Sequence, residues 1–171
     1  IEHGIDLVLR NTEVKDSGLR ARKLAEDQRI LCASPAYISK YGSPQTPESL
    51  EEHQLIVFKD AKGRKMTHSG NDESQSAVFS PSNARVRLSC DDGTSMKIAT
   101  LAGTGISMNS YWSVAHEIKQ GDLVHVLPDF YIDDQTAIWL VYPKANALSA
   151  KVRVFIDFLV EKIGDPAIWN R

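Results

Sequence analysis

The chain has 171 residues, of which 42% are apolar and 25% are charged, and its formal net charge at pH 7 is −2. This composition is that of an ordinary globular protein with one large or two small domains. No segment approaches the roughly 20 apolar residues of a membrane-spanning helix, and the near-neutral charge argues against direct DNA contact by this segment. We therefore expect neither a membrane partner nor nucleic-acid binding by this part of the protein.

Three strands are predicted in the first part of the chain. The first is apolar and partly β-branched, as buried strands are, the second alternates imperfectly and suits an edge-like strand, and the third has a stronger strand pattern. They cover residues 4–10, 19–26 and 28–33. Because only Glu26 and Asp27 lie at the junction of the last two, these should form either a hairpin or one kinked ribbon.

Two helix starts are marked by a hydroxyl residue followed by proline. Ser34 fits an N-cap and Pro35 the first helical position, where a missing N–H does no harm. Gly42 suits the end of that helix. Thr46 and Pro47 repeat the pattern and predict a second helix.

The remainder alternates between strands and helices, which predicts an α/β sheet. Residues 59–76 are polar and turn-rich and are expected to form a surface loop. The strands expected are 54–58, 83–90, 105–108, 122–130 and 136–143. The helices expected are 91–102, ended by Gly103 and Gly105, 110–120, closed by Gly121, and an amphipathic helix over 147–164 with Ser149 as its N-cap.

The order of these elements predicts an inserted lobe. The strand at 136–142 and the final helix need a sheet to pack on, and the strands within 5–33 are the natural partners. Residues 34–132 would then form a second lobe. Two lobes joined by two crossing strands leave a cleft, and such clefts bind small ligands.

No catalytic, metal or cofactor motif is found. The sequence contains no G-x-S-x-G, no Walker A and no C-x-x-C, and the "GTG" at 103–105 lacks a third glycine. None of the five histidines has metal-ligand spacing to another histidine or a cysteine. Ser34 as a nucleophile, or Cys32 as a reactive thiol, would need a base that the sequence does not name. Cys32 and Cys90 are expected to be buried thiols without a disulfide, and the cytoplasm is the default compartment.

Helix starts at strand ends are the candidate ligand sites. Their free N–H groups and positive dipole ends receive anions, hydroxyls add donors, and glycine permits close approach. The residues concerned are Ser34 and Pro35 at one helix start, Asp91, Asp92, Gly93 and Thr94 at another, and Arg10 at the end of the first strand. The alternative is capping alone for the cap residues and a solvated charge for Arg10.

In order and spacing, these segments resemble the effector-binding domain of LysR-type transcriptional regulators. The resemblance covers about residues 4–163. It rests on "GIDLVLR", "SPAYISKYGSPQTPESL" followed by His53, "CDDGTSMKIATLAGTGIS", "GDLVHVLPDF" and "LSAKVRVFIDFL".

The resemblance implies an α/β fold like that of type 2 periplasmic binding proteins, with two lobes and an effector cleft between them. Residues 1–33 and 133–171 would form lobe I, incomplete in this fragment, and residues 34–132 lobe II. The family's winged helix-turn-helix and the opening elements of lobe I would precede residue 1. Dimers of the sensor domain and tetramers of the full protein are implied.

The resemblance also adds to the candidate site. It implies that Ser34 and Pro35 enter the second lobe, that the segment 91–94 faces the cleft, and that Arg10 lies at the cleft edge. Ser107 and Asn109 are further candidates, with solvent-facing polar residues at a strand end as the alternative. The carboxylates at 91 and 92 would disfavour an anionic effector unless they point away.

The function expected is therefore the ligand-sensing regulatory domain of a bacterial LysR-type transcription factor in the cytoplasm. It would bind a small-molecule effector between its lobes and act on DNA through a domain outside this segment. The alternative is a solute-binding protein of the same fold that serves transport. An enzyme that uses the cleft is disfavoured because no catalytic motif is found.

Overall fold

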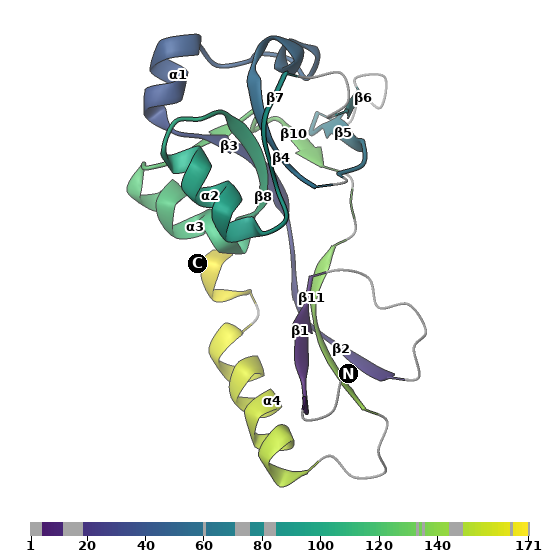
Figure 1. The fold of residues 1–171 in the computed structure, drawn as a ribbon. Coiled ribbons are helices and arrows are strands. Elements are labelled where there is room, and N and C mark those ends of the chain that lie inside the picture. The colour runs from purple at the N-terminus through teal and green to yellow at the C-terminus, as the bar shows by residue number, and fades with distance from the viewer. Residues whose placement is uncertain are drawn as a thin grey trace. The chain divides into compact units, whose positions relative to one another are not determined.

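The fold is described from a computed structural model, for residues 5–11, 19–59, 61–70, 76–80, 85–132, 134, 136–143, 149–164 and 166–170. The chain divides into two compact units, the first with one sheet and the second with two (Figure 1). Unit 1 comprises Ile1–Gln28 and Gln135–Arg171, and unit 2 comprises Arg29–Asp134.

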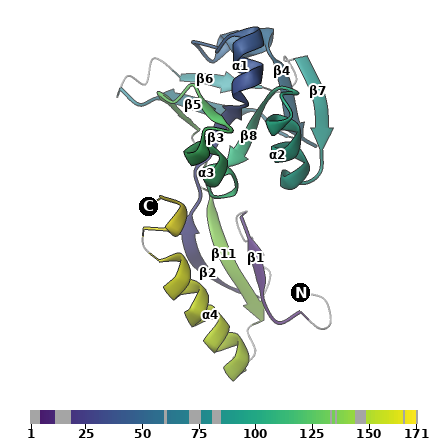
Figure 2. The ribbon, with the colours of Figure 1, turned by 90° about the vertical axis from the view of Figure 1, so that its left-hand side faces the viewer.

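Unit 1 is a three-stranded antiparallel sheet with a helix packed on it (Figure 2). The strand order is β1 (Val8–Arg10), β11 (Ala137–Pro143), β2 (Leu19–Glu26). The helix is α4 (Ala150–Ile163), and a short 3₁₀ turn, η4 (Ile168–Asn170), follows it. Leu140 and Tyr142 of β11 pack against Val152 and Ile156 of α4. The predicted amphipathic helix is confirmed, since its buried residues Val152 and Ile156 are four apart, as one helix face requires.

Unit 2 is built on a five-stranded mixed sheet. The order is β7 (Arg85–Cys90), β4 (Gln54–Phe58), β8 (Ile106–Ser110), β3 (Arg29–Ala33), β9 (Val124–Val126). The strand β4 runs parallel to both β7 and β8, whereas β3 is antiparallel to β8 and β9. The helix α2 (Gly93–Leu101) crosses over from β7 to β8, and α3 (Tyr111–Gln120) follows β8.

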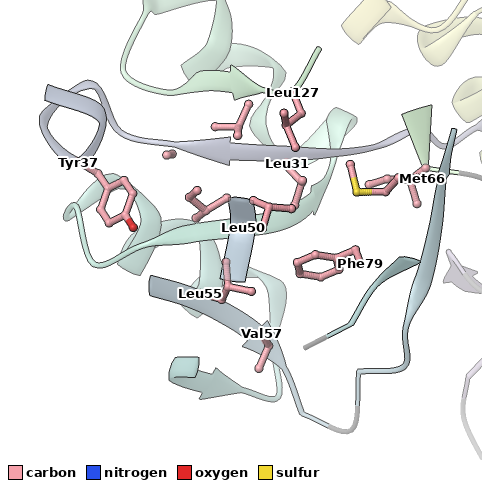
Figure 3. Close-up of a cluster of buried hydrophobic side chains, with 12 residues drawn as sticks. Leu31, Tyr37, Leu50, Leu55, Val57, Met66, Phe79 and Leu127 are labelled. Atoms are coloured by element: carbon pink, nitrogen blue, oxygen red, sulfur yellow. The ribbon is translucent and has the colours of Figure 1, made fainter. Parts of the chain in front are cut away.

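The strand β3 supplies both faces of this sheet with core residues, because side chains alternate along a strand. Ile30 and Cys32 pack with Val114 of α3 and with Leu123. Leu31 faces the other way, into the larger core (Figure 3).

The larger core is closed by three further elements. They are α1 (Pro35–Tyr41), the 3₁₀ helix η1 (Glu48–Glu52), and a small antiparallel sheet in the order β10 (Phe130–Ile132), β5 (Arg64–His68), β6 (Ser76–Phe79). Each element contributes a buried side chain to that cluster, including Tyr37, Leu50, Met66, Phe79 and Ile132.

The unit boundary lies earlier than the predicted lobe boundary after residue 33. The strand β2 pairs with β11 in unit 1, whereas β3 pairs with β8 and β9 in unit 2. The hairpin alternative for these two strands is therefore wrong, and the chain runs on from one sheet into the next.

Three local predictions are corrected. The loop expected over 59–76 contains the strand β5. Only Met66 and Thr67 of this strand are buried, so its sequence is mostly polar and lacks the pattern of a buried strand. The strand expected over 122–130 divides into β9 and β10, which belong to different sheets, and Leu127 between them has φ +53°. The helix predicted at Thr46 and Pro47 is a 3₁₀ helix that begins at Glu48, and the Thr46 hydroxyl accepts a hydrogen bond from the Ser49 amide at 3.4 Å.

The predicted caps of α1 and α2 are confirmed in the described chain. The Ser34 hydroxyl accepts a hydrogen bond from the Tyr37 amide at 3.2 Å, and Pro35 is the first helical residue. Beyond the end of α2, Gly103 has φ +75°, a conformation that favours glycine.

No helix among the described residues is both long and apolar enough to cross a bilayer.

A methyl group at Gly105 should destabilise unit 2. An added Cβ would lie 2.5 Å from the Gln54 carbonyl oxygen, a backbone atom of the adjacent strand that cannot yield easily. We expect Gly105→Ala to lower the free energy of unfolding by about 1–3 kcal/mol in a urea titration. The control is Gly93→Ala, where an added Cβ meets nothing within 4 Å. If the two variants unfold alike, the close approach of the strands is not a constraint.

Candidate functional site

A buried polar cluster lies between the main sheet and helix α2. Its members are Cys32 of β3, Ser107 and Asn109 of β8, and Thr100 of α2, and each is at most 5% exposed. Cys32 and Ser107 are directly opposite in the antiparallel register of β3 and β8. The alternation of both strands therefore turns these side chains toward the helices.

The hydrogen bonds of this cluster fix the direction of each proton. Thr100 Oγ1 donates to the Met96 carbonyl at 2.7 Å, so it can only accept from Ser107 Oγ at 2.6 Å. Ser107 in turn accepts from Asn109 Nδ2 at 2.6 Å, and the same amide donates to Cys32 Sγ at 3.3 Å. A relay of donors thus runs from β8 to a backbone carbonyl of α2 and fastens the helix to the sheet.

The Cys32 thiol is a packed member of this cluster and not a reactive group. Burial raises its pKa, and the hydrogen bond from Asn109 and the contact with Ser107 oppose that rise without cancelling it. The thiolate needed for nucleophilic chemistry is therefore disfavoured. Cys32 and Cys90 are both free, but Cys90 is partly exposed, which corrects the expectation that both are buried.

A second contact ties α2 to α3. Lys97 Nζ lies 2.8 Å from Glu117 Oε1 and donates to the Ser113 carbonyl at 3.0 Å. Burial alone would raise the pKa of Glu117, yet the hydrogen bond and the charge of Lys97 outweigh it and leave that pKa lowered.

The start of α2 is capped by its own carboxylate. Asp92 Oδ1 accepts from the Ser95 amide at 2.8 Å. Hydrogen bonds from Ser95 and from the Thr94 amide lower the pKa of Asp92, so the carboxylate stays ionised. Two of the free N–H groups that suggested an anion site are therefore occupied. The exposed groups that remain include the Asp91 carboxylate, the Thr94 hydroxyl and the open space at Gly93.

The predicted site residues fall into separate places. Because β4, β7 and β8 run parallel, their carboxyl ends lie on the same side of the sheet, and 91–94 and Asn109 lie at these strand ends. Ser34 follows β3, which runs the other way, so it lies at the opposite ends of the strands. An added Cβ at Gly103, past the far end of α2, would be 3.4 Å from Ser34 Oγ. With nine residues rising about 1.5 Å each, the two ends of α2 are about 13 Å apart.

Arg10 belongs to unit 1 and is exposed at the end of β1, opposite Trp139 of β11. Ser107 and Asn109 are buried, and the solvent-facing alternative for them is wrong.

Two further polar clusters were not predicted from the sequence. The Asp134 carboxylate, 7% exposed, lies 3.2 Å from Arg29 Nε and 3.5 Å from Arg64 Nη1. No local sequence signal points from Asp134 to these distant arginine partners.

The other cluster joins α1 to the strand β4. Tyr37 Oη accepts from the Gln54 amide at 2.9 Å and lies 3.1 Å from His53 Nδ1. All three groups are satisfied when the Tyr37 hydroxyl donates to a neutral His53. Burial lowers the pKa of His53, and Glu52 opposes this only in part. The histidine that follows the "SPAYISKYGSPQTPESL" motif is thus a structural partner of the tyrosine within it.

No group of three or more His, Cys, Asp or Glu side chains in the described part of the chain is arranged to hold a metal ion.

Comparison with known proteins gives one consistent family. The model of the LysR substrate binding domain matches residues 1–164. The chain is 34% identical over 165 residues to the HTH-type transcriptional regulator CrgA of Neisseria meningitidis serogroup C, covering 96% of this chain and 54% of that protein. It is 34% identical over 175 residues to the HTH-type transcriptional activator TtdR of Escherichia coli K12, covering 97% and 53%.

Solved structures agree with these sequence relatives. The CrgA regulatory domain from Neisseria meningitidis aligns with a TM-score of 0.78 and 32% identity, over 94% of this chain and 76% of that one. Full-length AphB, a virulence activator of Vibrio cholerae, aligns with a TM-score of 0.75 and 29% identity, over 91% and 51%. The chain spans about half the length of the curated relatives it matches.

Removing the Ser107 hydroxyl should loosen α2. Ser107→Ala leaves Asn109 without one acceptor and Thr100 without its donor in a site closed to water. We expect a loss of about 1–3 kcal/mol in the free energy of unfolding, measured by urea titration. Ser89→Ala on the exposed strand β7 is the matched control and should change it by less than about 0.5 kcal/mol. Equal stability of the two variants would contradict the role of the relay.

Acidification should destabilise the fold through His53. Because the folded pKa lies below the ordinary value of 6.5, the unfolded chain binds the proton more readily. The contribution of neutral His53 to the free energy of unfolding is therefore fully present above pH 6.5, and it is lost as the pH drops through the folded pKa. His125, whose pKa is also lowered by burial, adds to this loss. We expect His53→Asn to flatten the pH dependence of the unfolding free energy between pH 7.5 and 5.5; an unchanged slope would exclude His53 as its source.

Proposed function

The chain belongs to the LysR substrate-binding domain family, and on that premise we propose that it is the ligand-sensing regulatory domain of a LysR-type transcription regulator. The observation that carries the proposal is the family match over residues 1–164 together with relatives that are named transcriptional regulators. The family has the two-lobe α/β fold of type 2 periplasmic binding proteins, and its members are regulators rather than enzymes.

The whole regulator would contain more than this segment. We propose that it binds DNA through a helix-turn-helix outside these residues, because the similar proteins are named HTH-type regulators and are about twice as long. A regulator of transcription works in the bacterial cytoplasm. The sensor domain would form homodimers and the full protein homotetramers.

The ligand contacts of unit 2 would lie at the carboxyl ends of its parallel strands. In open α/β sheets, ligands bind outside the carboxyl ends of the strands. At these strand ends, Asp91 can accept hydrogen bonds from a ligand, Thr94 can donate or accept, and Gly93 leaves room for close approach. The two carboxylates at 91 and 92 favour a ligand with a hydrogen-bond donor or a positive group over a simple anion.

The polar relay would hold these strand ends in place. Thr100 and Ser107 bind α2 to the sheet at 2.6 Å, and Lys97 binds it to α3. Since α2 begins at Gly93, a rigid helix presents the ligand-contacting residues in one geometry, which lowers the entropy cost of binding. Regulation then follows from population shift, in which the ligand stabilises the conformation that it binds better.

The transport alternative has no specific observation in its favour, because the relatives named above are regulators.

The proposal is tested with the full regulator that contains this chain. Its binding to the upstream DNA of its own gene is measured by fluorescence anisotropy against a panel of small amino, hydroxy and carboxylic compounds. We expect at least one compound to change the DNA affinity. If none changes the DNA affinity or the DNase I footprint, the sensing role is wrong.

Substitutions at the two ends of the strands should show which candidate residues contact the ligand. With a compound that alters DNA binding, Thr94→Ala should weaken ligand binding about five- to tenfold in calorimetry, the value of one hydrogen bond. Ser34→Ala removes a helix cap and should cost about 1 kcal/mol of stability without changing ligand affinity. If Ser34→Ala weakened ligand binding and Thr94→Ala left it unchanged, the ligand would bind at the opposite ends of the strands, beside Ser34.

A further inference from the structure

A cavity of about 200 Å³ lies in unit 2 between the 3₁₀ helix η1 and the strand β6. Leu50 of η1 and Phe79 of β6, which are both buried and both labelled in Figure 3, belong to its apolar lining. Pockets for drug-sized ligands measure roughly 300–1,000 Å³. This cavity therefore suits a smaller molecule that has an apolar part.

The cavity exists because side chains fill the core face of β6 incompletely. Ala77 lies opposite Met66 in the register of β5 and β6, and directly opposed residues share a face of the sheet. On this face Met66 and Phe79 are buried in the larger core, whereas Ala77 is partly exposed and lines the cavity. The short side chain of alanine thus leaves a space that a longer one would occupy.

Two acidic side chains stand at the solvent side of this cavity. Glu48 and Glu51 both line it and are both exposed. Because a 3₁₀ helix has about three residues per turn, these side chains lie on the same side of η1, about 6 Å apart along its axis. Within the part of the chain that the structure describes, neither glutamate forms an ion pair. The cavity therefore combines an apolar interior with uncompensated negative charge at its opening.

This combination fits an ammonium group on an apolar stem. An ammonium group has only N–H donors and no acceptor, and carboxylates are acceptors only. A ligand with a carboxylate would instead be repelled by the two glutamates. We infer that the cavity between η1 and β6 binds a small organic amine, with its apolar part against Leu50 and Phe79 and its ammonium group at Glu48 and Glu51.

The cavity is separate from the ligand contacts proposed at 91–94. The helix η1 ends at Glu52 and β4 starts at Gln54, so η1 lies at the amino ends of the parallel strands. Residues 91–94 follow β7 and lie at the carboxyl ends. The inference therefore goes beyond the proposed sensing role and does not rest on it, and a failure of either leaves the other intact.

The test uses 2-phenylethylamine as the probe and the full regulator that contains this chain. Binding is titrated by saturation-transfer NMR, with 3-phenylpropionate as the matched ligand that carries the same apolar group on a carboxylate. We expect a Kd of roughly 0.1–1 mM for an amine of this size. The amine should also raise the thermal midpoint of unfolding, because a ligand of the folded state stabilises it. Equal binding of the two compounds, or binding of neither, would overturn the inference.

Substitutions then locate the bound amine. Ala77→Leu fills the cavity and should abolish binding without loss of stability, since cavity-filling changes commonly stabilise a fold. The double variant Glu48→Gln with Glu51→Gln should raise the Kd about five- to tenfold, the value of two exposed ion pairs. Glu52→Gln, on the same helix but outside the cavity, is the matched control and should leave the Kd unchanged.

Two results with these variants would overturn the inference. One is unchanged binding in Ala77→Leu, including the case in which Thr94→Ala weakens binding instead. The other is an equal Kd in the double variant and in Glu52→Gln, which decides the question if Ala77→Leu folds poorly.

A lysine side chain of another protein carries the same ammonium group on a flexible apolar stem. Nα-acetyl-lysine amide is therefore titrated in parallel with 2-phenylethylamine. We expect the free amine to bind more tightly, because its phenyl group contacts the apolar lining more completely. Tighter binding of the lysine derivative would overturn the assignment to a small amine.

Discussion

The relay of hydrogen bonds beneath α2 is the constraint on which the candidate site depends. Ser107 is bound on one side by Asn109 and on the other by Thr100, with both distances at 2.6 Å, and the final acceptor is the Met96 carbonyl. Such a network is stabilising only when every member is satisfied. It exists because the alternation of β3 and β8 turns Cys32, Ser107 and Asn109 toward the helices while Leu31 fills the opposite core.

The two ends of α2 lie at opposite ends of the strands, and the polar residues of the candidate site are separated accordingly. The start of α2 lies at the carboxyl ends of β4, β7 and β8, where ligand contacts in α/β sheets are found. Its end lies beside Ser34, where the cap of α1 is packed against Gly103.

The sequence predicted the elements whose signals are local. Ser34 before Pro35 and Ser149 at the start of α4 marked helix starts correctly, and the spacing of Val152 and Ile156 marked a buried face. Predictions failed where the signal is long-range. The polar strand β5 is stabilised by β6 and β10, and the arginine partners of Asp134 come from the distant strands β3 and β5. The ordered motifs identified the family, but the residues they suggested for the site are separated: Arg10 lies in unit 1, Ser107 is buried, and the others lie at opposite ends of the unit 2 strands.

Native-state hydrogen exchange of the backbone amides in α2 tests the central claim most directly. The account holds that the side chain of Ser107 binds this helix to the sheet. In Ser107→Ala, it predicts a larger acceleration of exchange for the amides of Ile98 to Ala102 than for those of β4, because the helix opens more often on its own in addition to the general loss of stability. Equal acceleration in α2 and β4 would mean that Ser107 stabilises the whole unit and not the helix in particular. Unchanged protection of α2 would contradict the claim outright.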